Sequence, residues 1–292
     1  MIKGSIVALV TPFLESKKIN YQKLKELIDF HLNNNTEGIL LFGTTGEGST
    51  LSLIEKYYIA RYVINYVKNS VPIILNVGSN STSEVLKNIK KLEKLKPDAF
   101  LVISPYYNKT NEEGMFYHFK TVHDSTLIPI IIYNVPSRTN IDMSISLIKR
   151  LSKLDRITGI KEASKDINKL KELALCQNDN FYWYSGNDER MVEDIRLGAK
   201  GLIGVCSNTH PKIVKEIIDL ALNEKYDEPE RLFLKIKEYI NVLNIDINPI
   251  PIKEAMNILN FNVGKYRLPL FETSLDNKNK IKKILKETTI WT

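Results

Sequence analysis

Short apolar segments rich in β-branched residues alternate with amphipathic segments along most of the chain. The apolar segments have the length of strands buried on both faces, and the segments between them, such as 21–35, 83–96 and 145–154, place apolar residues at helical spacing. One strand and one helix recur every ~20–35 residues, which is the size of a βα unit. We therefore predict eight strands, at residues 5–10, 38–42, 72–77, 99–104, 129–133, 157–161, 181–185 and 201–206.

Eight strands that alternate with helices predict an α/β protein whose sheet closes into a (β/α)8 TIM barrel over residues 1–222. An open doubly wound sheet is the structural alternative, but it usually has fewer strands and a glycine-rich dinucleotide turn that this sequence lacks. After residue 222 the pattern is helical only. We therefore expect residues 223–292 to form a three-helix extension that packs on the barrel, with helices at 229–245, 250–260 and 277–287.

The composition is ordinary for a soluble globular protein, with 43% hydrophobic and 26% charged residues. No apolar run approaches the roughly 18 residues of a membrane span. The apolar stretch near the N-terminus is not followed by a small-residue cleavage site, so we interpret it as the first strand rather than as a signal peptide. We expect a cytoplasmic protein that does not bind a membrane.

The net charge of +7 could indicate a nucleic-acid partner. The lysines, however, are scattered over helix faces that also carry glutamates, as in 83–96 and 277–287. We therefore attribute the charge to a composition typical of an AT-rich genome and expect no nucleic-acid partner. A positive field would still help to gather small anionic substrates.

Cysteine and histidine usage argues against disulfides and metal ions. Cys176 and Cys206 are the only cysteines, which are too few for a disulfide framework, and we expect both thiols to be buried and unreactive. The four histidines show no metal-ligand spacing, and His118 and His123 are five positions apart, which places them on different helical faces. We therefore predict no catalytic metal.

A lysine ends the sixth predicted strand. In (β/α)8 barrels the active site lies at the C-terminal ends of the strands, and Lys161 stands there directly after the apolar segment 157–160. Desolvation at this position would disfavour the charged ammonium, lower its pKa and leave a neutral amine that can attack a carbonyl as a Schiff-base nucleophile. Alternatively, the side chain extends to water from the strand end. The position alone leaves both interpretations open.

A glycine-rich turn, "GTTGEGS" at residues 43–49, follows the second strand. Such a turn can direct backbone N–H groups and the hydroxyls of Thr44 and Thr45 toward an anion. It matches neither a dinucleotide nor a P-loop pattern, so we expect a small carboxylate rather than a nucleotide. The alternative, a tight turn without a ligand, explains the glycines but not the two adjacent threonines.

Two further strand ends carry chemistry-bearing side chains. Tyr133 places a phenol that could move protons for a neighbouring Schiff base, and Arg138 offers a two-pronged guanidinium for a carboxylate. Each could also be structural, as a core tyrosine and a surface arginine. In "SPYYNK", we expect one of Tyr106 and Tyr107 to pack while the other projects, with subunit contact as the alternative to a catalytic role.

Several segments, taken together and in order, resemble the dihydrodipicolinate synthase family of pyruvate-dependent class I aldolases, which includes N-acetylneuraminate lyase. These segments are "VTPF", "GTTGE", "YNVPSRT", "IKEAS", "SGND", "NPIPIKEAM" and "RLPL". The resemblance covers essentially the whole chain. It implies that Lys161 forms an imine with pyruvate and that Thr44 and Thr45 hold the pyruvate carboxylate. Tyr133, Thr45 and Tyr107 would form a proton relay, with Tyr107 supplied by a neighbouring subunit.

The resemblance also implies a second substrate, L-aspartate 4-semialdehyde, whose carboxylate Arg138 would bind, and a pocket lined by Gly186 and Ile203. It implies a homotetramer built from tight dimers, no metal or organic cofactor, and a role in lysine and diaminopimelate biosynthesis. One departure is Gly204, where synthases of this family often carry serine.

The family's allosteric lysine site is matched only in part. Asn80, Glu84 and Tyr106 correspond to it, and Ser49 is assigned to the same site. Strongly inhibited members, however, carry histidines at the positions of Leu53 and Lys56. Because a cation at position 56 disfavours a cationic effector, we predict weak or absent inhibition by lysine.

Two alternative functions remain, one within the same family of aldolases and one from another class. A sister aldolase that cleaves N-acetylneuraminate or a 2-keto-3-deoxy sugar acid would share Lys161, Tyr133 and the threonine pair, but would need hydroxyl-binding groups in place of Arg138. A non-catalytic, ligand-sensing barrel would have no need of the nucleophile. The intact set of Lys161, Tyr133 and Arg138 therefore favours the synthase over both.

Overall fold

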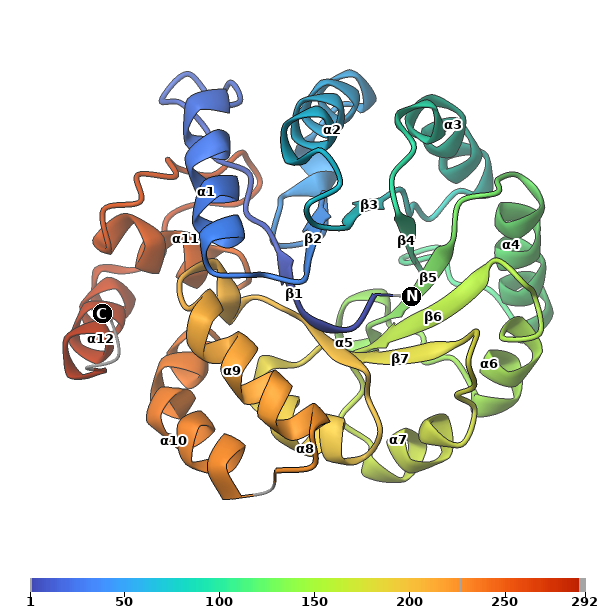
Figure 1. Cartoon of the computed structure of the whole chain (residues 1–292). Coiled ribbons are helices and arrows are strands. Elements are labelled where there is room, and N and C mark those ends of the chain that lie inside the picture. Colours follow the sequence, from blue (N-terminus) through green and yellow to red (C-terminus); the bar gives the residue numbers. More distant parts are fainter. Residues whose placement is uncertain (1, 226, 289–292) are drawn as a thin grey trace.

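The computed structural model describes residues 2–225 and 227–288, and within these residues eight parallel strands close into one barrel (Figure 1). Each strand pairs with the next one along the chain, and β8 pairs back with β1 through registers such as Gly4–Gly201. This arrangement confirms the predicted (β/α)8 barrel. The strands are β1 (Gly4–Ala8), β2 (Gly38–Leu41), β3 (Ile73–Asn76), β4 (Ala99–Ile103), β5 (Ile130–Asn134), β6 (Ile157–Glu162), β7 (Tyr182–Ser185) and β8 (Gly201–Gly204).

The helices form an outer ring around the strands (Figure 1). They are α1 (Tyr21–Asn33), α2 (Leu53–Val67), α3 (Thr82–Leu92), α4 (Glu112–Asp124), α6 (Ile145–Leu151), α7 (Ile167–Ala174), α8 (Met191–Arg196) and α9 (Pro211–Leu222). The short helix α5 (Pro136–Thr139) lies inside this ring, near the centre of the barrel (Figure 1). Short 3-10 turns lie at η1 (Gly48–Thr50), η2 (Glu93–Leu95), η3 (Asp188–Arg190) and η4 (Cys206–Asn208).

Three more helices follow the barrel, α10 (Asp227–Val242), α11 (Ile250–Ile258) and α12 (Leu275–Glu287). α10 packs against α8 and α9, and α12 packs against α10 and α11, so the three cover one side of the barrel (Figure 1). Residue 226 and residues 289–292 of the predicted extension lie outside the described residues. Among the helices described, none is both long and apolar enough to cross a membrane.

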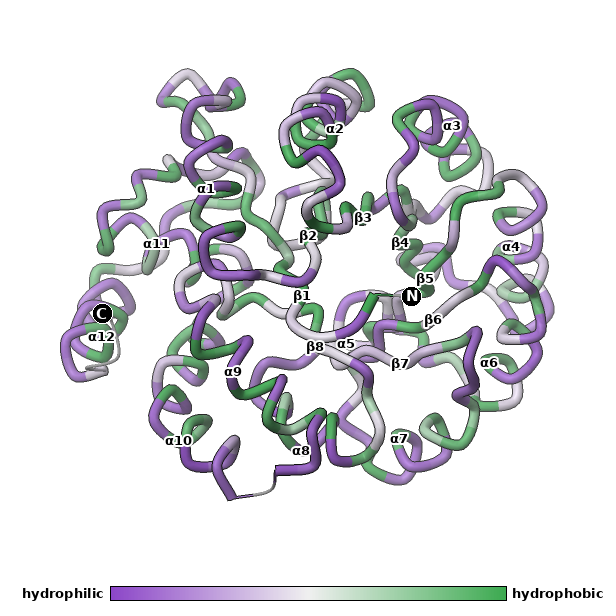
Figure 2. Tube along the Cα trace, viewed as in Figure 1, coloured by the Kyte–Doolittle hydropathy of each residue, from purple (hydrophilic) through white to green (hydrophobic). Residues whose placement is uncertain are grey.

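Alternate residues of each strand face two different apolar clusters. Ile6 and Ala8 of β1 point into the barrel, whereas Val7 points toward the surrounding helices. Because both faces of the sheet are buried, the strands are continuously apolar. The helices, in contrast, alternate between hydrophobic and hydrophilic positions (Figure 2).

The predicted first and last strands are too long at their C-terminal ends. β1 ends at Ala8 and β8 at Gly204, although Leu9, Val10 and Cys206 are all buried. These apolar residues belong to connections that fold over the top of the barrel. Because these residues are also buried, the apolar sequence pattern continues past the last hydrogen-bonded strand residues, and the predicted strands were therefore too long.

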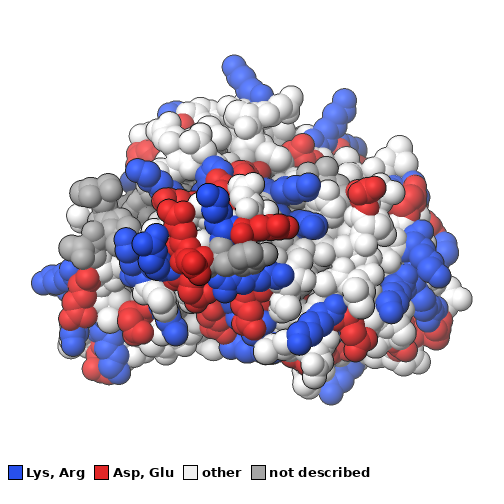
Figure 3. Space-filling model, turned by 60° about the horizontal axis from the view of Figure 1, so that its bottom comes forward, with Lys and Arg blue, Asp and Glu red and all other residues white. Residues whose placement is uncertain are grey.

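Charged side chains of both signs mix on the molecular surface. On the face shown in Figure 3, lysines and arginines lie among aspartates and glutamates. Pairs such as Lys120–Asp124, at 2.6 Å, and Arg196–Glu230, at 2.9 Å, illustrate the same arrangement. The net charge of +7 therefore does not gather into one basic patch on this face.

Candidate active site

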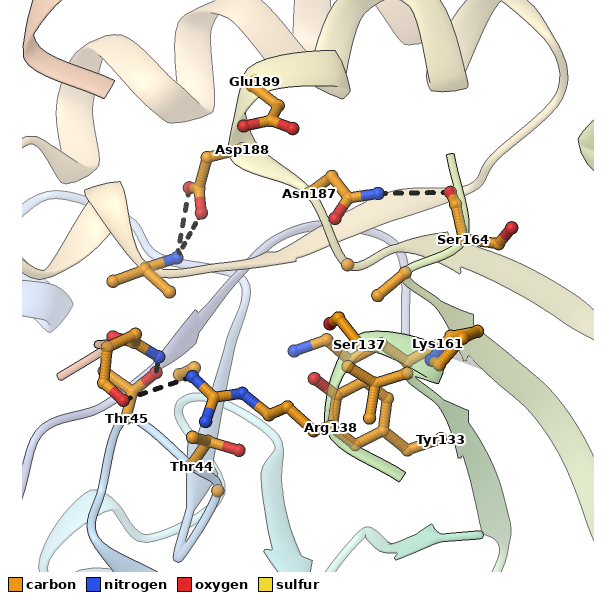
Figure 4. A pocket seen from close by; sticks show the side chains of 18 of the residues that line it. Thr44, Thr45, Tyr133, Ser137, Arg138, Lys161, Ser164, Asn187, Asp188 and Glu189 are labelled. Carbon is orange, nitrogen blue, oxygen red and sulfur yellow. Dashed lines mark hydrogen bonds between the residues drawn. The ribbon is translucent and has the colours of Figure 1, made fainter. Parts of the chain in front are cut away.

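A cavity of about 340 Å³ opens at the C-terminal ends of the barrel strands (Figure 4). This volume is at the lower end of the range for ligand pockets, so the cavity suits small substrates. The cavity brings together six of the residues singled out in the sequence, from the ends of four strands: Thr44, Thr45, Tyr133, Arg138, Lys161 and Gly186.

Lys161 lies inside the barrel and is only 6% exposed. It faces inward because β6 alternates its side chains, and the sheet register sets it directly beside Tyr133 of β5. Its Nζ lies 4.6 Å from the centroid of the Tyr133 ring (Figure 4). The structure therefore excludes the interpretation in which this lysine extends to bulk water.

Burial lowers the pKa of Lys161 to about 8. Desolvation is the main cause, while the nearby Asp188 carboxylate raises this pKa and the Arg138 guanidinium lowers it. At pH 7 about one molecule in ten then holds the neutral amine, against about one in a few thousand for an unperturbed lysine. A nucleophilic amine is thus available at this barrel mouth.

Tyr133 keeps its phenol proton at neutral pH. Burial raises the pKa of Tyr133 to about 12, because the phenolate would be desolvated, although Arg138 acts in the opposite direction. A neutral phenol can both donate and accept a hydrogen bond, and it can pass on its own proton while it receives another, which suits the shuttling role expected of it.

Asn248 was not singled out as a site residue in the sequence, yet it connects two of those that were. Its Nδ2 donates to Oγ1 of Thr45 at 3.1 Å, and its backbone carbonyl oxygen accepts from Nη2 of Arg138 at 3.3 Å. Asn248 belongs to the segment between α10 and α11, so the C-terminal extension reaches into the site. The motif "NPIPIKEAM" begins with this residue and was the available signal.

Arg138 lies on a short helix rather than in a loop. Pro136 occupies the first turn of α5, where its missing N–H has no consequence. The arginine is exposed, and its guanidinium extends from the side of Tyr133 toward Thr44 and Thr45 (Figure 4). It can therefore meet a carboxylate on a substrate that enters the cavity.

Asp188 is a second residue that the sequence analysis did not assign. It lines the cavity and accepts hydrogen bonds from the backbone N–H groups of Val205, at 2.9 Å, and Cys206, at 3.0 Å. A Cβ on Gly204 would lie 2.6 Å from Oδ1 of Asp188. The glycine at 204, a departure from the family pattern, therefore leaves room for this carboxylate.

Gly186 and Ile203 have different positions. A Cβ on Gly186 would lie 3.1 Å from Cε of Lys161, so the glycine keeps space for the lysine side chain. Ile203, in contrast, is fully buried in the cluster inside the barrel and does not line the cavity. Val205 is the apolar lining residue after β8. The expectation that Ile203 lines the pocket is corrected, because its side chain packs in the apolar cluster inside the barrel with residues such as Ile6.

The adjacent tyrosines behave as expected, since Tyr106 is half-buried and Tyr107 is 91% exposed. Tyr107 has a left-handed φ of 72° and does not line the cavity of its own chain. Its participation from a neighbouring subunit stays a prediction.

A second cavity, of about 600 Å³, lies behind the threonine turn. It collects Ser49, Glu84 and Tyr106 together with Leu53 and Lys56, and burial lowers the pKa of Lys56. Asn80 does not line it. The two cavities share four wall residues, Gly43, Thr44, Arg138 and Asn248.

The cysteines and histidines are structural within the described residues. Cys176 and Cys206 are both buried and free, as predicted. His118 and His123 are both buried residues of α4. They nevertheless have separate partners, Thr82 for His118 and Asp155 for His123. The described residues contain no group of three or more His, Cys, Asp or Glu arranged to hold a metal ion.

Comparison with known proteins identifies close relatives along the whole chain. The profile of the dihydrodipicolinate synthetase family matches residues 1–288. A 4-hydroxy-tetrahydrodipicolinate synthase of Caldicellulosiruptor saccharolyticus is 42% identical over 286 residues, which cover 98% of this chain and 96% of that relative.

Two solved structures superpose closely on the fold. The dihydrodipicolinate synthase of Aquifex aeolicus has a TM-score of 0.96 at 36% identity, covering 99% of both chains. The chloride-inhibited dihydrodipicolinate synthase of Acinetobacter baumannii, solved in complex with pyruvate, has a TM-score of 0.97 at 36% identity and covers 99% of this chain and 100% of that one.

Proposed function

The chain belongs to the dihydrodipicolinate synthetase family, and we propose that it condenses pyruvate with L-aspartate 4-semialdehyde, the reaction of a 4-hydroxy-tetrahydrodipicolinate synthase. This makes it a lyase of the class I aldolase type. One observation carries the chemistry: a buried lysine with a pKa of about 8 faces a neutral tyrosine inside a small cavity. The pyruvate complex of the Acinetobacter relative supports the first substrate.

In the first half-reaction the neutral amine of Lys161 attacks C2 of pyruvate. The carbinolamine then loses water to give an imine, and the Tyr133 phenol supplies and recovers the protons. The hydroxyls of Thr44 and Thr45 hold the pyruvate carboxylate beside the amine. Loss of a proton from C3 of the bound pyruvate produces an enamine.

In the second half-reaction C3 of the enamine attacks the aldehyde carbon of L-aspartate 4-semialdehyde. A carbon–carbon bond forms, and the aldehyde oxygen takes up a proton from the relay of Tyr133, Thr45 and Tyr107. Arg138 binds the carboxylate of this substrate. The substrate amine then attacks the imine carbon, which closes the ring, breaks the bond to Lys161 and frees the enzyme.

We further propose a cytoplasmic homotetramer, built as a dimer of dimers, in which Tyr107 enters the relay from a neighbouring subunit. The exposure of Tyr107 in its own chain supports this assignment. The proposed reaction uses no metal or organic cofactor and no nucleic-acid or membrane partner. Its product serves lysine and diaminopimelate biosynthesis.

The second cavity supports weak or absent inhibition by lysine. Although Ser49, Glu84 and Tyr106 meet there, the ammonium of Lys56 lies on the same wall, and like charges repel. A synthase assay with added L-lysine tests this proposal. An inhibition constant in the low micromolar range would contradict it.

Borohydride reduction in the presence of pyruvate tests the covalent chemistry. We expect the wild type to carry a reduced pyruvate adduct on Lys161, identified by peptide mass, and Lys161→Ala to carry none. A wild type that forms no adduct would refute the aldolase mechanism and favour a ligand-sensing barrel.

A coupled assay with both substrates tests the second half-reaction. Arg138→Ala should weaken the use of the aldehyde and leave trapping with pyruvate largely intact, because Arg138 contacts the second substrate. N-acetylneuraminate serves as the control substrate, and its cleavage at a comparable rate would point to a sister aldolase.

A further inference from the structure

The turn that carries Thr44 and Thr45 is held by a buried carboxylate. Glu47 follows two residues after Thr45, with a left-handed φ of 52° and a side chain that is fully buried. Both of its oxygens are occupied: Oε1 accepts from Nζ of Lys253 at 2.8 Å, and Oε2 accepts from the backbone N–H of Arg267 at 3.0 Å. Both donors come from the C-terminal extension, more than 200 residues away.

Lys253 of α11 is a fully buried ammonium whose hydrogen bonds are complete. It donates to Glu47 and to the carbonyl oxygens of Thr11, at 3.3 Å, and Lys265, at 2.8 Å. Three acceptors match its three protons. Its Nζ also lies 4.6 Å from the ring centroid of Phe13. The amine is thus fixed in position and direction.

The same loop segment is held from its other side. The hydroxyl of Thr11 donates to the carbonyl oxygen of Gly46 at 2.6 Å, and Thr45 accepts from Asn248 of the extension. The turn therefore lies between β1 and the extension, with Glu47 as its charged attachment. A Cβ at Gly46 would lie 2.9 Å from the carbonyl oxygen of Leu9, which shows how closely the two segments approach.

A buried ion pair is weak evidence for stability, because apolar residues of similar volume often stabilise a fold equally well. Such a pair instead fixes the orientation of the two segments that it joins, because each of its hydrogen bonds has one required partner. A carboxylate-binding turn needs that direction, because hydroxyls misplaced by about 1 Å lose much of their contribution.

We propose that Lys253 and Glu47 are positioning residues that hold the Thr44–Thr45 turn in its carboxylate-binding conformation. This inference rests on the proposed function, because it assumes that the turn binds pyruvate. The C-terminal extension then completes the pyruvate site through the Lys253–Glu47 pair, in addition to covering one side of the barrel.

The test compares Lys253→Met and Glu47→Gln with wild type in steady-state assays and in borohydride trapping over a range of pyruvate concentrations. We expect the KM for pyruvate to rise about tenfold or more and the KM for the aldehyde to stay within about threefold. The kcat at saturating pyruvate should fall as well, because the displaced Thr45 also belongs to the proposed relay. Trapping should require about tenfold more pyruvate.

Ile281→Ala is the matched control for loss of stability. Ile281 is a fully buried residue of α12 in the same extension and lines neither cavity. This variant should lower Tm but leave the KM for pyruvate unchanged. If Ile281→Ala raises that KM as much as Lys253→Met does, the pair acts only through stability and the inference is wrong.

The combined variant Glu47→Gln with Lys253→Met removes both charges and leaves no unpaired charge in the core. The combined variant is assayed if Lys253→Met fails to fold. If both Lys253→Met and the combined variant fail to fold, the KM of Glu47→Gln for pyruvate tests the inference. An unchanged KM for pyruvate in a folded variant overturns the inference. Absence of trapped adduct in the wild type would instead refute the proposed function, so the two failures are distinguishable.

Discussion

At the scale of single residues, the site depends on placing an amine where its charge is unfavourable. Lys161 is 6% exposed, and its surroundings offer the Tyr133 ring and the more distant Asp188 carboxylate rather than water. Desolvation disfavours the ammonium form of Lys161. It therefore both lowers the pKa, which makes the amine reactive, and lowers the free energy of unfolding at neutral pH. Two predictions follow from this balance.

The first prediction concerns pH. Because only the neutral amine attacks pyruvate, the rate of adduct trapping should rise with pH and reach half its maximum near pH 8. Asp188→Asn removes a negative charge that raises the pKa of Lys161, so its midpoint should shift to lower pH. Asp124→Asn, at an exposed position on α4, serves as the control. An upward shift for Asp188→Asn would contradict this electrostatic assignment.

The second prediction concerns stability. The pKa of Lys161 is about 8 when folded and 10.5 as the ordinary value, so burying the ammonium costs ~3 kcal/mol at neutral pH. Between these two values the unfolded chain binds more protons, and wild-type stability should rise as pH increases. Lys161→Met should therefore be more stable than wild type near pH 7, with a smaller advantage near pH 10.

Urea unfolding at the two pH values measures this difference. Lys165→Met, in which the replaced lysine side chain is 70% exposed, should show no such pH-dependent gain. A Lys161→Met variant that is less stable than wild type near pH 7 would show that burying the lysine ammonium does not destabilise the fold.

At the scale of elements, the turn after β2 is the most constrained connection at the site. Phe42 and Glu47 both adopt left-handed φ values, of 63° and 52°, and Gly48 lies against the backbone of Phe42. The following helix is capped by Ser52, whose side chain accepts from the N–H of Glu55. The turn thus enters α2 in one defined direction, which sets where Thr44 and Thr45 lie.

Gly48→Ala tests this constraint. Its Cβ would lie 1.9 Å from the carbonyl oxygen of Phe42, which is backbone and cannot rotate away. We expect a loss of at least about 3 kcal/mol of unfolding free energy and a higher KM for pyruvate. In the control Gly114→Ala, the new Cβ would meet the hydroxyl of Thr110, an exposed side chain that can rotate. That variant should stay within about 1 kcal/mol of wild type, and equal losses in the two would contradict the explanation.

At the scale of the whole molecule, barrel closure and the docked extension assemble the cavity from distant segments. Thr45 and Asn248 are 203 residues apart in sequence and are joined by one hydrogen bond. Tyr107, in contrast, is 91% exposed and does not line the cavity of its own chain. The proposed relay of Tyr133, Thr45 and Tyr107 would therefore take its Tyr107 from a second copy of the chain.

Mixed oligomers test that requirement. Tyr107→Phe and Lys161→Ala should each have low activity alone. After co-expression or subunit exchange, some sites combine an intact Lys161 with the intact Tyr107 of a neighbour, and activity should recover to a measurable fraction of wild type. Mixing Tyr133→Phe with Lys161→Ala is the control, because both residues belong to one chain's cavity. Recovery in neither mixture would show that Tyr107 does not act from a neighbouring subunit.

The sequence by itself determined the order of strands and helices, because apolar periodicity reflects local requirements for burial. It also determined which residue types stand at the strand ends, and hence the candidate set of Lys161, Tyr133, Arg138 and the threonine pair. Only the tertiary structure decided that Lys161 is desolvated, that Ile203 lies below the cavity, and that the extension contacts the turn. Those facts depend on strand alternation at the barrel's actual register and on contacts between segments about 200 residues apart, which no local pattern encodes.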